Sequence, residues 1–150
     1  MAFKRKPPPL NVRRVRSLGT NFRGVTTNKR GRLVQFGSPR EIYEDPVSIY
    51  AASRLGQPRI NVLPANVFAG APTGAEQIGL RPEQIIQGEG EDSFVQRVEH
   101  LGDQTRLHLT FKSHDIITVT NAHTELRTGD IVKIRPNKPL YFGANGARVA

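Results

Sequence analysis

The sequence predicts a mainly β fold, a small barrel or sandwich that follows a short helical hairpin and a basic N-terminal segment. Short runs of alternating apolar and polar residues recur from residue 59 to the end, and Gly-containing turns separate them. Helix-start signals are confined to residues 38–46. Several short strands at regular spacing are typical of small all-β domains, and 150 residues suit one domain with an additional segment.

The basic charge is concentrated at the N-terminus. Residues 1–32 contain ten Lys and Arg and no acid, whereas the other 118 residues carry twelve basic and thirteen acidic side chains, a net of −1. Residues 7–9 are consecutive prolines. Such a segment buries too little apolar surface to offset the cost of ordering it, so residues 1–30 are expected to form a disordered basic tail. An organelle transit peptide is the alternative, although the prolines oppose an amphipathic helix.

A strand and two short helices are expected next. Residues 32–36 alternate as a half-buried strand does. Ser38, Pro39 and Glu41 then form a helix start, because the serine can cap, the proline suits the first helical position and the glutamate completes a capping box. Asp45-Pro46 repeats the device, so a second short helix is expected from that point.

The rest of the chain is expected to be strands and turns. Residues 102–104 are expected to form a hairpin turn, and the Gly-rich segments 70–74 and 88–92 to form loops. The expected strands are short and evenly spaced, and they span 59–63, 77–81, 94–101, 105–111, 116–120, 131–135 and 140–142.

The residues offer no case for an enzyme. The chain has no cysteine, which excludes disulfides, thiolate metal sites and a cysteine nucleophile. It has neither a G-x-x-x-x-G-K-[ST] loop to hold phosphates nor a G-x-S-x-G elbow. No two of the four histidines have the i, i+4 spacing of a zinc protease; they are His100, His108, His114 and His123. We therefore predict no catalytic residue, no metal site and no cofactor. No apolar run approaches the roughly 18–20 residues that span a bilayer.

Nucleic-acid binding is an alternative function. A small barrel can bind single strands through stacked aromatic side chains beside a basic groove. Here the part expected to fold is almost neutral, and Phe94, Phe111 and Phe142 lie among apolar neighbours, so these three are expected in the core. The basic tail could still bind phosphates without sequence preference. Binding to nucleic acid is therefore not favoured.

Two groups of segments resemble a known family. Residues 31–46 (Gly-Arg-Leu-Val-Gln-Phe-Gly-Ser-Pro-Arg-Glu-Ile-Tyr-Glu-Asp-Pro) closely resemble the segment that closes the nucleotide-binding domain in maltose-type and glycerol-phosphate-type ABC importer ATPases. Residues 56–64 are similar to that family's bridge into its regulatory domain. The remaining similar segments lie in the TOBE portion, an OB-like barrel, and they are residues 78–83, 99–105, 128–132 and 140–149.

The composition separates a basic tail over residues 1–30, which match no segment of the family. The resemblance implies a remnant of the nucleotide-binding domain end over residues 31–58 and a TOBE regulatory domain over residues 59–150. The family's phosphate-binding loop, signature loop and catalytic carboxylate are absent from this sequence. The resemblance therefore implies a non-catalytic regulatory or dimerisation domain. The Ser-Ala-Arg-Asn phrase of molybdate-type relatives is also absent, which weakens the other alternative, an oxyanion- or small-ligand-binding domain.

The resemblance also implies partners and a location. We expect a homodimer and contact with ABC importer subunits, the ATPase and the membrane permease, in the cytoplasm at the inner face of the plasma membrane. Two sets of residues are expected to form contacts. The first is the apolar side of the helical hairpin, and the second is a barrel segment: Ile42, Tyr43, Val47, Ile49 and Tyr50; and Arg81, Pro82 and Glu83.

Overall fold

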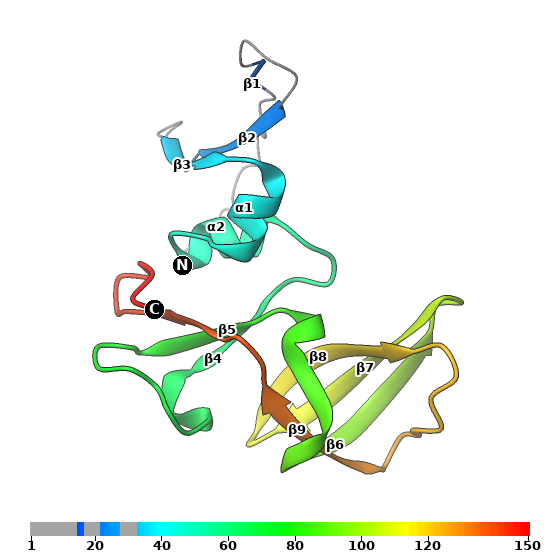
Figure 1. Cartoon of the computed structure of the whole chain (residues 1–150). Helices are drawn as coiled ribbons and strands as arrows, with labels where there is room; N and C mark the ends of the chain where they lie inside the picture. Colours follow the sequence, from blue (N-terminus) through cyan, green and yellow to red (C-terminus); the bar gives the residue numbers. More distant parts are fainter. Residues whose placement is uncertain (1–14, 17–21, 28–32) are drawn as a thin grey trace, which may run out of the picture. The chain divides into compact units, whose positions relative to one another are not determined.

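The computed structural model describes residues 15–16, 22–27 and 33–150, and it divides the chain into two compact units, Met1–Gly56 and Gln57–Ala150 (Figure 1). Each unit has its own sheets and helical turns. Strands predominate over helices in the described residues, so the prediction of a mainly β fold is confirmed.

The first unit contains a small antiparallel sheet followed by two helices. Its elements are β1 (Val15–Arg16), β2 (Phe22–Thr27), β3 (Leu33–Gly37), α1 (Pro39–Glu44) and α2 (Ile49–Arg54), with the strands in the order β1-β2-β3. Strands β1 and β2 lie within residues 1–30, the segment that was expected to form the tail. The rest of residues 1–30 lies outside the described residues.

The capping box predicted for α1 is confirmed. The Glu41 amide donates to Ser38 Oγ at 3.1 Å, and the Ser38 amide donates to the Glu41 carboxylate at 2.8 Å. The start of the second helix was predicted too early. Asp45 ends α1, and Ser48 caps α2 by accepting a hydrogen bond from the Ala51 amide at 3.1 Å. A serine with extended backbone therefore provides the cap in place of Asp45-Pro46.

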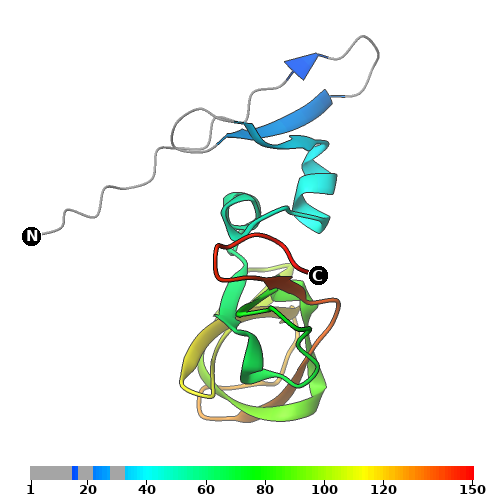
Figure 2. The same ribbon diagram turned by 90° about the vertical axis from the view of Figure 1, so that its left-hand side faces the viewer.

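The second unit consists of two antiparallel sheets. One has the order β10-β5-β4 and the other the order β8-β7-β6-β9. In the view of Figure 2 these strands curve around a common interior, as in a small barrel. Their bounds, with those of two 3-10 turns, are β4 (Asn61–Pro64), η1 (Ala65–Val67), β5 (Gln77–Leu80), η2 (Pro82–Gln84), β6 (Ile85–His100), β7 (Gln104–Phe111), β8 (His114–Asn121), β9 (Ile131–Pro136) and β10 (Leu140–Phe142).

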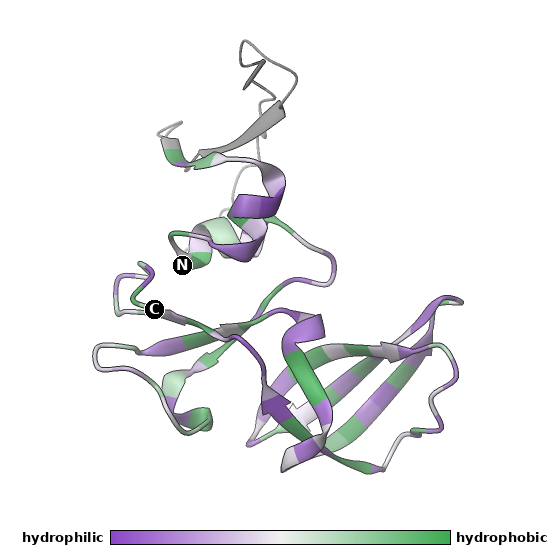
Figure 3. Cartoon of the chain, viewed as in Figure 1, coloured by the Kyte–Doolittle hydropathy of each residue, from purple (hydrophilic) through white to green (hydrophobic). Residues whose placement is uncertain are grey.

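The core lies inside this second unit. Along β7 every second side chain is buried and its neighbours are partly exposed, and Figure 3 shows the matching alternation of hydropathy along the strands. The rings of Phe68 and Phe111 stack with centroids 4.8 Å apart. The buried cluster is Leu63, Ala65, Val67, Phe68, Ile78, Leu80, Ile85, Val95, Leu107, Leu109, Phe111, Ile116, Val132, Ile134 and Tyr141.

The loop predicted at residues 88–92 is wrong, because β6 continues through it. The pairing of β6 with β9 shifts there, so that both Gln87 and Glu91 lie opposite Ile134. Gly88 and Gly90 have φ angles of 101° and 108°, which L side chains rarely adopt. The two glycines thus form a bulge that bends the strand and preserves its ladder on either side.

Candidate functional site

The expected contact residues of the helical hairpin differ widely in exposure. Ile42 is only 1% exposed, so it belongs to the interior of the structure. Val47 is 46% exposed, while Ile49 and Tyr50 are half-buried. Tyr43 is also half-buried. The apolar surface that α1 and α2 offer to a partner therefore centres on Val47 and the start of α2.

The barrel segment at residues 81–83 is mostly internal. Arg81 is 1% exposed and Pro82 is buried, whereas Glu83 is exposed. The turn is closed by two hydrogen bonds of 2.8 Å, from the Arg81 amide to the Gln84 side chain and from the Gln84 amide to the Arg81 carbonyl. Because arginine is rarely fully buried, the burial of Arg81 could not be predicted from the sequence. Contact with a partner at this segment would fall to Glu83.

An exposed apolar pair lies on the outer face of the larger sheet. Phe94 of β6 and Ile131 of β9 are directly opposite in register and are 46% and 68% exposed. The expectation that Phe94 lies in the core is therefore wrong. Phe111 and Phe142 are 1% and 0% exposed, so the expectation that these two residues lie in the core is confirmed. The nucleic-acid alternative gains little, because two of its three candidate stacking rings are inaccessible.

A charged cluster occupies the same outer face. The Glu99 carboxylate contacts Arg97, lies 3.6 Å from Arg106 Nη1 and lies 2.9 Å from His108 Nε2. Arg97 Nη2 is also 3.0 Å from His108 Nε2. The sequence placed His108 on the polar side of its strand, which is confirmed, but it did not reveal these cross-strand partners. The cluster holds the imidazole ring in place at the surface.

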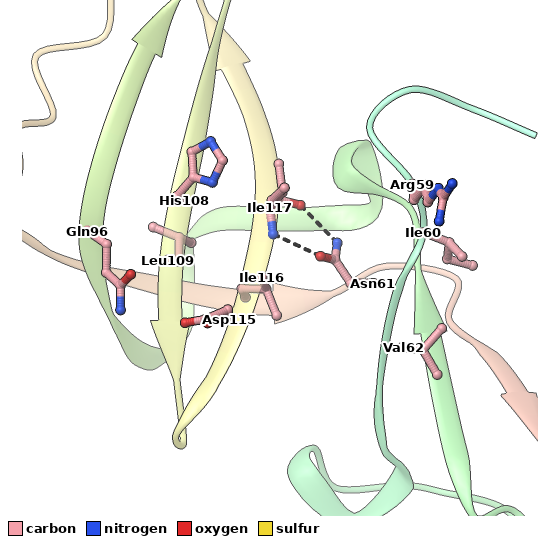
Figure 4. A pocket seen from close by; sticks show the side chains of 10 residues that line it. All are labelled: Arg59, Ile60, Asn61, Val62, Gln96, His108, Leu109, Asp115, Ile116 and Ile117. Carbon is pink, nitrogen blue, oxygen red and sulfur yellow. Dashed lines mark hydrogen bonds between the residues drawn. The ribbon is translucent and has the colours of Figure 1, made fainter. Parts of the chain in front are cut away.

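A pocket of about 380 Å³ lies where β4 and the residues before it meet the larger sheet (Figure 4). Hereafter it is called the β4–β8 pocket. Its walls come from β6, β7, β8 and residues 59–62, segments that are far apart in the sequence. The residues that line it are Arg59, Ile60, Asn61, Val62, Gln96, His108, Leu109, Asp115, Ile116 and Ile117.

Asn61 fixes the geometry of this pocket. Its side-chain amide donates to the Ile117 carbonyl at 2.8 Å and accepts from the Ile117 amide at 2.8 Å, as the dashed lines in Figure 4 mark. The same amide nitrogen donates to the Leu80 carbonyl at 3.0 Å. Because β8 is an edge strand of its sheet, Asn61 satisfies backbone groups that would otherwise lack partners.

Two charged side chains at the pocket remain uncommitted. Arg59 and Asp115 are both exposed, and neither side chain makes a hydrogen bond or ion pair within the part of the chain that the structure describes. Gln96, by contrast, donates to the Thr110 hydroxyl. The pocket therefore presents a free donor group and a free acceptor group. Sequence reasoning identified none of this, since the lining residues come together only in three dimensions.

Metal-binding clusters and membrane-spanning helices are both absent from the described residues. Over residues 15–16, 22–27 and 33–150, no three His, Cys, Asp or Glu side chains lie together in a way that could hold a metal ion. Within those same ranges no helix has the length and apolarity needed to cross a membrane.

Similarity to known proteins covers most of the chain. Residues 78–139 match the TOBE domain. The uncharacterized ABC transporter ATP-binding protein y4oS of Sinorhizobium fredii is 30% identical over 151 residues, which cover 84% of this chain and 41% of that protein. The sn-glycerol-3-phosphate import ATP-binding protein UgpC of Ruegeria pomeroyi is 34% identical over 141 residues, which cover 80% and 40%.

A sugar-import protein is also similar. The maltose/maltodextrin import ATP-binding protein MalK of Photorhabdus laumondii is 28% identical over 131 residues, covering 63% of this chain and 36% of that protein. The chain thus spans about two fifths of the length of the relatives it matches.

Proposed function

Because residues 78–139 are a TOBE domain and the chain is homologous to ATP-binding subunits of sugar- and glycerol-phosphate-type ABC importers, we propose that it is a non-catalytic regulatory and dimerisation module of such an importer. The extent of the similarity carries the proposal. The similarity to the Ruegeria pomeroyi protein covers 80% of this chain, which is 120 residues. The part of the chain from the start of the TOBE match to the C-terminus, residues 78–150, has only 73 residues. At least 47 residues before Ile78 are therefore included, which takes in α1 and α2.

The absence of ATPase motifs from the sequence supports the non-catalytic part of the proposal. A phosphate-binding loop presents backbone N–H groups and a lysine to the phosphates, and no such string occurs in the 150 residues. The Gly-rich segment around Gly88 and Gly90 carries Glu89, Glu91 and Asp92, which would repel a phosphate. These residues instead form a bulge within β6.

The proposed partners follow from the relatives. We propose that the chain pairs with a second copy of itself and contacts the ATP-binding and membrane-permease subunits of an importer. The chain would then be located in the cytoplasm, at the inner face of the plasma membrane, where the transporter complex holds it. The exposed apolar residues Val47, Phe94 and Ile131 support a role in contacts with other chains.

The proposal is tested by calorimetric titration of the whole chain with magnesium-ATP. We expect no heat of binding at micromolar affinity, and a micromolar dissociation constant would contradict the non-catalytic assignment. The regulatory part needs a second experiment. Residues 31–150 would replace the homologous region of the Ruegeria pomeroyi protein, and uptake of sn-glycerol 3-phosphate by cells would be measured. We expect uptake to be retained; a stable chimera that abolishes uptake would contradict a shared regulatory role.

A further inference from the structure

We propose that the β4–β8 pocket binds a small, hydroxyl-rich molecule that carries no net charge. The proposal rests on the pocket alone and does not depend on the partners proposed above. It starts from the two side chains that the folded chain leaves uncommitted at one cavity, Arg59 and Asp115.

The chemistry of these two groups selects the ligand. A guanidinium only donates hydrogen bonds, and a carboxylate only accepts them. Arg59 and Asp115 do not form an ion pair with each other, so both remain available to a bound molecule. A hydroxyl group both donates and accepts, so the hydroxyl groups of a polyol can hydrogen-bond to either side chain. A simple anion would be attracted by Arg59 and repelled by Asp115, and a simple cation would meet the reverse.

The neighbouring charged cluster defines the competing ligand. Glu99 contacts Arg97 and Arg106, which leaves one net positive charge beside His108 at the pocket. Nε2 of His108 is already occupied by Glu99 and Arg97, so the ring is held in position. A small anion is accordingly the alternative that an experiment must separate from a neutral polyol.

The walls of the pocket suit the carbon skeleton of such a ligand. Val62 and Ile117 are half-buried and give aliphatic surface against which C–H groups can pack. Asn61 joins β4 to β8 through its two hydrogen bonds with Ile117, so both walls are already in place. A volume of about 380 Å³ falls within the range of roughly 300–1,000 Å³ found for small-molecule sites.

The test is an NMR titration of the whole ¹⁵N-labelled chain with glucose and with glycerol. We expect saturable shifts of the Val62, His108 and Ile117 amide signals, with dissociation constants on the order of 1–10 mM for so small a contact. Asp115→Asn removes a charged acceptor and should weaken binding by about tenfold. Asp115 is exposed and unpaired among the described residues, so the variant is expected to fold normally.

The matched control is Asp103→Asn, because Asp103 is an exposed carboxylate in the turn between β6 and β7, outside the pocket. It should bind both polyols as the wild-type chain does. Inorganic phosphate and glycine betaine serve as anionic and zwitterionic probes, and neither should saturate. Three results would overturn the proposal: no saturable shift with either polyol, an Asp115→Asn titration that matches wild type, or saturation by phosphate or betaine without saturation by polyols.

Discussion

Asn61 uses its side-chain amide to pair with both backbone groups of a single residue, Ile117, through two hydrogen bonds of 2.8 Å. Asn61 belongs to the sheet β10-β5-β4 and Ile117 is in β8 of the other sheet. The side chain therefore pairs with Ile117 as a neighbouring strand would, and it joins the two sheets of the second unit. It is 9% exposed, so its hydrogen bonds are largely shielded from water.

Asn61→Ala should destabilise the second unit by about 2–3 kcal/mol, because the Ile117 amide and carbonyl lose their partners in a poorly hydrated place. The free energy of unfolding would be measured by urea denaturation. Asn66→Ala is the matched control, since Asn66 is exposed and its side chain makes no hydrogen bond within the described residues, and it should change stability by less than about 0.5 kcal/mol. Equal effects of the two substitutions would show that the Asn61 hydrogen bonds contribute nothing.

Gly90→Ala should be far more destabilising than Gly88→Ala. A Cβ atom on Gly90 would lie 2.1 Å from the Ile134 carbonyl oxygen, whereas a Cβ on Gly88 would meet no atom within 4 Å. Both glycines have positive φ, so both substitutions share a backbone penalty of about 1–2 kcal/mol. Only Gly90→Ala adds a steric clash with backbone, and we expect its total loss to exceed about 3 kcal/mol. Thermal unfolding of both variants would compare them, and equal losses would disprove the close approach to β9.

These glycines show what the sequence could and could not predict. The capping box at Ser38 and Glu41 was predictable, because a cap depends on residues that are three positions apart. The bulge was not, because it depends on β9, more than forty residues further along the chain. In isolation, a Gly-rich acidic segment favours a loop, and only pairing with Ile134 makes it part of a strand.

The candidate contact residues follow the same rule. Alternation along β7 predicted which side chains enter the core, since period two is a local property. The expectation that Phe94 lies in the core rested on its apolar neighbours, and it was wrong because the bulges in β6 change which side of the sheet each residue faces. The buried state of Arg81 and the assembly of the β4–β8 pocket depend on tertiary contacts that no local pattern encodes.

Ser113→Gly should stabilise the second unit. Lys112 and Ser113 form the two-residue turn between β7 and β8 with φ angles of 45° and 67°, a left-handed conformation that is unfavourable for L residues. Glycine at the second position removes this penalty, and we expect a gain of about 0.5–1 kcal/mol. Lys112 is kept, because its ammonium donates to the Val67 carbonyl at 2.6 Å and pairs with Glu91.

Thr73→Gly is the control for this substitution in denaturant unfolding. Thr73 is exposed and its φ angle is not positive, so glycine there only adds freedom to the unfolded chain and should lower stability slightly. Destabilisation by Ser113→Gly, to the same extent as by Thr73→Gly, would show that the turn carries no strain.

Self-association should depend on a single surface. A two-fold dimer lets one patch meet its own copy, so one charged substitution is introduced twice at the contact. If the α1–α2 hairpin forms the contact, Ile49→Asp should shift the chain to monomer in sedimentation equilibrium, and Val47→Asp, at a position already 46% exposed, should do the same without disturbing the fold. If the barrel segment forms it, Glu83→Lys should dissociate the dimer and the two hairpin variants should not.

Arg81 is unsuitable for this test, because reversing the charge of a side chain that is only 1% exposed would damage the fold itself. A wild-type chain that sediments as a monomer at high micromolar concentration would disprove dimerisation through either surface.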